Sequence, residues 1–248
     1  MADISRKAWD KYIEVLRKLN DAAADQFKEY LRTHEIETRI QRDAAIEYAY
    51  ALATRYGEAS AEFAAQMYES VARASKKTIE AAIPAETATY GEVAKTINGT
   101  LKQSTNIDLI GNSVGRLVKQ AGVDTVCKNA IRDSAEWAWI PSGDSCAFCM
   151  MLASNGWQPA SKNVLKGNHA EHIHANCDCT FAVRFNSRTN VEGYNPKYYQ
   201  DMFKDAEGST WEDKINYLRR EHYAEHRDEI LEQQKEAVEP QNQINEDL

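Results

Sequence analysis

Cysteine side chains cluster in one short part of the chain. Four of the five cysteines form two pairs, a C-x-x-C of Cys146 and Cys149 and a C-x-C of Cys177 and Cys179. A C-x-x-C turn lets two thiolates converge on one ion. In an extended C-x-C, residues i and i+2 point to the same side, so both sulfurs can face one site. The two pairs together therefore predict a four-coordinate zinc site.

More donors are present than a tetrahedral zinc requires. His174 leads into the second pair as H-x-x-C-x-C, so the candidate ligands are Cys146, Cys149, His174, Cys177 and Cys179. Cys146, Cys149 and Cys177 take three places, and the fourth falls to either His174 or Cys179. A catalytic zinc keeps one position open, whereas this site is rich in cysteine and has a full set of ligands. We therefore expect the zinc to be structural.

Other chemistries fit these residues less well. A disulfide pair would suit an exported protein, but the N-terminus lacks the apolar stretch typical of a secretory signal. A redox C-x-x-C needs a thioredoxin-like βαβ pattern, which the sequence does not display. A zinc deaminase would place H-x-E before P-C-x-x-C, whereas His169 and Glu171 follow the pair here. A zinc-dependent hydrolase or nuclease that uses His169, Glu171 and His172 remains an alternative. The fifth cysteine, Cys127, is expected to be a buried small side chain in a helix.

Long helices are predicted before the cysteine-rich part. Apolar residues recur at steps of three and four over residues 9–31, which predicts a helix of about 28 residues. A second pattern covers residues 40–56, is interrupted at Gly57, and continues over residues 63–84. Because small side chains let helices approach closely, the dense alanines between residues 44 and 82 predict a helical hairpin or an extended antiparallel pair.

Shorter elements are predicted in the middle of the chain. Glycines punctuate residues 85–136, so we expect helices in shorter pieces there, the last of them capped by Asp124. Residues 137–140 and 180–185 have the composition of strands, and each lies beside a cysteine pair.

The end of the chain carries the charge imbalance. We predict a loop over residues 186–208 and a helix over residues 209–238 that Ser209 begins with a capping box. The net charge of −8 arises from 30 basic and 38 acidic residues, and residues 201–248 hold 14 of the acidic and 6 of the basic ones. The remainder is balanced, so no basic footprint for specific nucleic-acid binding is evident. No apolar run reaches the length of about 18 residues that would predict a membrane-spanning helix.

These patterns together predict a mainly α fold. Long N-terminal helices and a helical middle region precede a small zinc-stapled β-hairpin module and a C-terminal helix. The expected parts are a long helical hairpin region (1–84), a helical body (85–136), a small α+β zinc module (137–200) and an acidic C-terminal helix and tail (201–248).

Two motifs in the module carry a family resemblance. The first is SGDSCAFCMMLASNG at residues 142–156, and the second is HANCDCT at residues 174–180. In this order they resemble the minor capsid, or head-morphogenesis, proteins of tailed bacteriophages, including relatives of the phage Mu F protein. Ala175 and Asp178 stand where members of that family often carry proline and arginine. A long helical part before the module also resembles the family.

The resemblance implies a non-enzymatic assembly component with a structural Zn²⁺. Its implied partners are the phage portal, the major capsid protein or both, with self-association through the helices as a further option. The implied locations are the interior of the virion head and the host cytoplasm during assembly. The alternatives are the zinc-dependent hydrolase or nuclease and a cellular zinc-ribbon adaptor protein.

Overall fold

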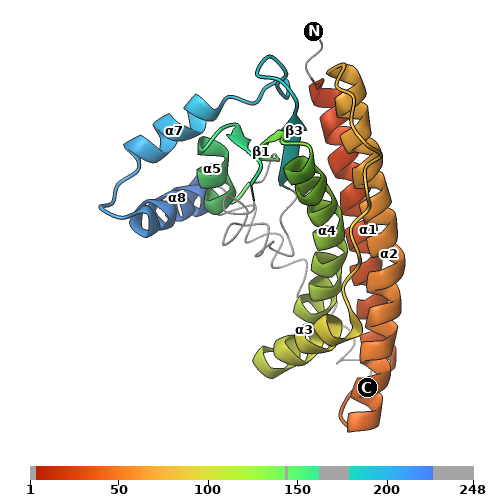
Figure 1. Cartoon of the computed structure of the whole chain (residues 1–248). Coiled ribbons are helices and arrows are strands. Elements are labelled where there is room, and N and C mark those ends of the chain that lie inside the picture. Colours follow the sequence, from red (N-terminus) through yellow and green to blue (C-terminus); the bar gives the residue numbers. More distant parts are fainter. Residues whose placement is uncertain (1–3, 143–144, 162–178, 226–248) are drawn as a thin grey trace.

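The computed structural model describes residues 4–142, 145–161 and 179–225 and is mainly helical, with a small three-stranded sheet (Figure 1). None of the described helices is long and apolar enough to cross a membrane. The elements in chain order are α1 (Arg6–Thr33), α2 (Arg39–Ala74), α3 (Tyr90–Gln103), α4 (Ile107–Arg132), β1 (Glu136–Ile140), α5 (Ala147–Ser154), β2 (Gln158–Pro159), β3 (Thr180–Arg184), α7 (Pro196–Asp205) and α8 (Trp211–Glu225).

The first two helices lie antiparallel to each other, and α4 packs along both of them (Figure 1). Helix α1 is 28 residues long, which confirms the length predicted from its apolar spacing. Oγ of Ser5, the residue that caps the start of the helix, accepts a hydrogen bond from the backbone N–H of Ala8. Helix α2 begins with a reciprocal capping box between Thr38 and Gln41. The capping bonds at both helix starts give partners to backbone N–H groups that a helix otherwise leaves unpaired.

The predicted interruption at Gly57 is wrong. Helix α2 runs without a break for 36 residues and ends at Ala74, before Pro84. A Cβ added at Gly57 would lie 2.9 Å from Cγ2 of Thr87. The glycine therefore makes room for the extended segment 77–89, which lies against this helix.

The prediction of short helical pieces is also wrong for α4. This helix runs for 26 residues through three glycines, and Asp124 lies inside it instead of capping it. A Cβ at Gly115 would lie 2.8 Å from the carbonyl oxygen of Asn20 in α1, and one at Gly122 would lie 2.6 Å from Oγ of Ser60 in α2. These two glycines are therefore contact points with α1 and α2, not helix breaks.

Side chains of α4 hold the extended segment 77–89 in place. Nδ2 of the buried Asn129 donates to the carbonyl oxygen of Ile83 at 2.9 Å, and the N–H of Ile83 donates to Oδ1 of Asn129 at 3.0 Å. Oγ1 of Thr125 accepts a bond from the N–H of Ala85 at 2.9 Å. The bonds satisfy backbone groups that have no ladder partner in the segment.

A polar cluster closes the C-terminal end of α4. The Arg132 guanidinium donates to both carboxylate oxygens of Asp133 at 2.8 Å, and the hydroxyl of Tyr68 donates to Oδ2 of Asp133 at 2.9 Å. The guanidinium holds the pKa of the Asp133 carboxyl below its usual value. Burial, followed by the bond to Asp133, raises the pKa of Tyr68.

The sheet has the strand order β2-β1-β3, with antiparallel pairs that confirm both predicted strands. Trp137, Trp139 and Phe181 belong to an apolar cluster with residues of α2 and α4. Ala138 and Ile140 belong to a second cluster with residues of α1. Both faces of the sheet are therefore covered, which explains why residues 137–140 of β1 and 181–183 of β3 are apolar.

The C-terminal part differs from the prediction in two places. The predicted loop contains α7, which Asn195 caps and Pro196 begins, a position that suits proline. The capping residue of helix α8 lies one position later than predicted, because Thr210 and Asp213 exchange the capping bonds in place of Ser209. The predicted continuation of this helix to residue 238 lies outside the described residues from 226 on.

Candidate metal centre and inter-helix groove

Two predicted ligands lie together at the start of α5. Cys146 is the residue before the helix, and Cys149 is in its first turn. Their Sγ atoms are 3.6 Å apart. A disulfide would bring them to about 2.05 Å. Two thiolates on one tetrahedral zinc, each about 2.3 Å from the metal, would be about 3.8 Å apart. The observed separation therefore fits two corners of a zinc tetrahedron.

The thiol pair lies at the N-terminus of α5, the end of a helix that carries partial positive charge. Cys149 is fully buried and Cys146 is half-buried. The Cys146 side chain makes no capping hydrogen bond to the helix.

The far end of α5 is fixed by residues that follow β3 in the sequence. The hydroxyl of Tyr194 donates to the carbonyl oxygen of Ala153 at 2.7 Å, and Nε2 of Gln200 donates to that of Ser154 at 2.8 Å. Figure 1 shows α7 and α8 packed beside α5. The carbonyl groups that end the helix thus have partners, and the orientation of the thiol pair is set from both sides.

Cys179 lies directly before β3 and is buried. The pairing of Ile140 with Thr180 brings it to the turn that follows β1. Its Sγ is 3.0 Å from Oγ of Ser145 and 3.8 Å from Oγ of Ser142. The second cysteine pair is therefore tied through position 179 to the turn that leads into Cys146.

The other predicted ligands, His174 and Cys177, lie outside the described residues, as do His169, Glu171 and His172. Among the residues that the structure describes, no group of three or more His, Cys, Asp or Glu side chains is arranged to hold a metal ion. The described residues alone therefore do not make a metal site.

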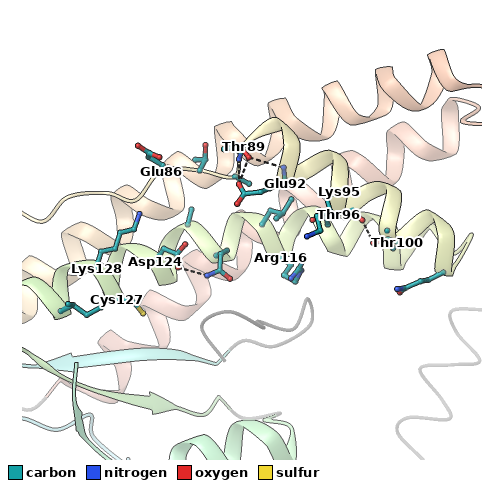
Figure 2. Close-up of a pocket in the computed structure, with 18 residues that line it drawn as sticks. Glu86, Thr89, Glu92, Lys95, Thr96, Thr100, Arg116, Asp124, Cys127 and Lys128 are labelled. Carbon is teal, nitrogen blue, oxygen red and sulfur yellow. Dashed lines mark hydrogen bonds between the residues drawn. The ribbon is translucent and has the colours of Figure 1, made fainter. Parts of the chain in front are cut away.

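A groove of about 1130 Å³ lies on another side of the helical body (Figure 2). It is lined by the end of segment 77–89, by one face of α3 and by the face of α4 that α1 and α2 leave uncovered. Lys95 and Arg116 lie toward one end of the groove in Figure 2, and Glu86 and Lys128 toward the other. The surface is therefore of mixed charge.

Burial raises the pKa of two titratable groups between these ends. Nε2 of Gln120 donates to Asp124 at 2.8 Å, while burial raises the pKa of Asp124. Burial, together with the charge of Asp124, raises the pKa of the Cys127 thiol, so this sulfur is a neutral thiol at pH 7. Cys127 lies in α4 as expected but is half-buried, and it lines the groove.

Several residues that build the site were not predicted from the sequence. Ser145, Tyr194 and Gln200 act through partners 34 to 46 positions away, so no local pattern marks them. A signal for α7 was present, because Asn195 followed by Pro196 is a regular helix start.

Comparison with known proteins places the chain in a family. The family model described as VG15 protein matches residues 3–206. The chain belongs to the VG15 protein family. This is a family of phage gene products, so the protein is phage-encoded. The match runs from the residues before α1 to the end of α7 and includes every predicted zinc ligand. No curated protein and no solved structure matches the chain significantly.

Proposed function

We propose that the chain is a minor capsid, or head-morphogenesis, protein of a tailed phage. It acts as a structural component at the portal or the inner capsid surface, in the head interior of the virion and in the host cytoplasm during assembly. The resemblance of residues 142–156 and 174–180 to that class of proteins motivates the proposal, and membership of a phage family is consistent with it. The observation that carries it is the pair of thiols 3.6 Å apart at the start of α5.

The thiol pair supports a structural Zn²⁺. Cys146 and Cys149 would hold two of its places, Cys177 the third, and His174 or Cys179 the fourth. When bound, the metal closes the chain between the two cysteine pairs. The metal would add stability to a sheet of short strands, since β2 has 2 residues and β1 and β3 have 5 each. Metal binding would supply that folding free energy.

The module is anchored to the long helices, which would present it to a partner. Ile4 before α1 forms a parallel bridge with Val191, with hydrogen bonds of 2.9 Å to Asn190 and Glu192. The sheet itself lies between α1 on one face and α2 and α4 on the other. A metal-stapled module on a rigid helical body suits a role in assembly. Its partners would be the portal, the major capsid protein or further copies of this chain.

Particle association tests the proposal. We expect the wild-type chain to sediment with precursor or mature heads of the phage that encodes it, at a fixed number of copies per head. Cys146→Ser should remove the chain from heads because the module loses its metal. The matched control is Cys127→Ser, which changes a thiol outside the predicted ligand set and should leave association intact. Absence of the wild-type chain from both kinds of head would contradict a capsid role and favour a cellular adaptor.

A further inference from the structure

The groove between α3 and α4 has the size of a site for a protein segment. Its volume of about 1130 Å³ exceeds the range of about 300–1,000 Å³ that is usual for small-molecule pockets. Its lining residues in α4 run from Arg116 to Ile131, a stretch of about 22 Å along a helix. A bound segment of that length has about 15 residues if it is helical and about 7 if it is extended.

Part of the lining is apolar and open to a partner. Leu117 and Ile131 line the groove and are each half-buried. In α3, Gly99 leaves room beside them, since an added Cβ there would meet no described atom within 4 Å. A segment bound in the groove therefore removes apolar surface from water, which favours binding.

Two acidic side chains of the groove already have partners. The carboxylate of Glu92 accepts hydrogen bonds from the N–H and the hydroxyl of Thr89 at 2.7 and 2.8 Å. Asp124 accepts one from Nε2 of Gln120 at 2.8 Å. These bonds hold both carboxylates against their own helices.

The cations of the groove are different. Within the described part of the chain, the side chains of Lys95 and Arg116 form neither an ion pair nor a hydrogen bond. They come from α3 and α4 and lie toward the same end of the groove (Figure 2). At the other end, Glu86 and Lys128 have opposite charges. One end therefore presents two positive charges without an ion-pair partner among the described residues, and the other end is balanced.

We propose that the groove binds an acidic segment of a different protein of the phage head, whose carboxylates pair with Lys95 and Arg116. This inference rests on the proposed function and adds to it a docking surface and the chemistry of the partner. Nucleic acid fits the groove less well, because the carboxylates of Glu86 and Glu92 would repel a polyphosphate chain. The described helices of a second copy also fit less well, because the most acidic of them, α2 and α8, each have only one more acidic than basic residue.

Site-specific photocrosslinking in assembled heads tests the proposal. A photoreactive amino acid in place of Gly99 should crosslink to a protein other than this chain, and mass spectrometry should locate the crosslink in a segment of net negative charge. The same amino acid in place of Gly91, an equally open position of α3 outside the groove, should not give this product.

Reversal of one charge tests the electrostatic part. Lys95→Glu changes an exposed side chain and should lower the number of copies per head about tenfold, because like charges then face each other in the interface. The matched control is Lys102→Glu, which reverses an exposed cation of α3 outside the groove and should leave the number unchanged. Thermal unfolding checks that both variants keep their fold. Replacing the crosslinked acidic residue of the partner by lysine should restore incorporation of Lys95→Glu.

Each contrary result has a distinct meaning. Equal numbers of wild-type and Lys95→Glu chains in heads, or no crosslink from position 99 to an acidic segment, would overturn the inference while the proposed function stands. A crosslink from position 99 to a second copy of this chain would assign the groove to self-association and overturn the inference as well. Absence of the wild-type chain from heads would overturn the proposed function together with the inference.

Discussion

Replacing Gly115 by alanine should separate α4 from α1 and destabilise the helical body. The added Cβ would lie 2.8 Å from the carbonyl oxygen of Asn20 and 3.4 Å from Cβ of Ala24. The first distance is shorter than a carbon and a backbone oxygen normally approach, and the oxygen belongs to a helix that cannot move alone. One of the two helices must therefore shift along a contact that spans much of its length.

Two opposing contributions determine how far Gly115→Ala changes the free energy of unfolding. Alanine is favoured over glycine within a helix by up to about 1 kcal/mol. Overpacking a well-packed contact costs about 1–3 kcal/mol. We expect the second term to win, with a net loss of about 1–2 kcal/mol in the free energy of unfolding. In a protein of this size each kcal/mol lowers Tm by about 2–4 °C.

A matched substitution isolates the packing term. At Gly99, within α3, an added Cβ meets no described atom within 4 Å. Gly99→Ala should therefore raise the free energy of unfolding, by up to about 1 kcal/mol. Urea unfolding followed by circular dichroism measures both variants against the wild type. A Gly115→Ala protein as stable as the wild type, or shifted in the same direction as Gly99→Ala, would refute the close contact between α1 and α4.

Three further predictions follow from other contacts. Asn129→Ala removes both hydrogen bonds to Ile83 and should cost about 2–3 kcal/mol, measured by urea unfolding, because two backbone groups lose their partners. The arginine beside Asp133 lowers the folded pKa of this carboxyl, so its stabilisation is complete above about pH 5 and is lost as the pH falls below about 4. The stability difference between wild type and Asp133→Asn should therefore shrink between pH 7 and pH 3, and a constant difference would contradict this linkage. If a partner occupies the groove, Gly99→Gln should reduce incorporation into heads, whereas Gly91→Gln, at an equally open position of α3 outside the groove, should not.

The extent of a helix could be predicted from the sequence where its apolar residues form a regular stripe. The spacing over residues 9–31 gives the length of α1, and the apolar runs give β1 and β3. Gly57, Gly115 and Gly122 were misleading because a glycine in a helix costs only about 1 kcal/mol, which long helices with buried faces easily exceed. Their positions are explained by a segment or helix that is distant in sequence.

The candidate site, like the fold, could be predicted from the sequence only where contacts are local. The C-x-x-C spacing predicts the thiol pair, since both sulfurs belong to one turn. The contact between Ser145 and Cys179 depends on the register of β1 against β3, which no local pattern specifies. The Tyr194 and Gln200 bonds to α5 depend on the docking of α7. Such contacts become visible only when the tertiary structure is known.

The proposed role depends most on a structural zinc. Its most direct test is zinc content per chain in protein purified without added metal, measured by elemental mass spectrometry together with thermal unfolding, beside a Cys146→Ser variant. We expect about one zinc per wild-type chain and loss of both the metal and thermal stability in the variant. A metal-free wild-type protein with titratable thiols, as stable as the variant, would contradict it.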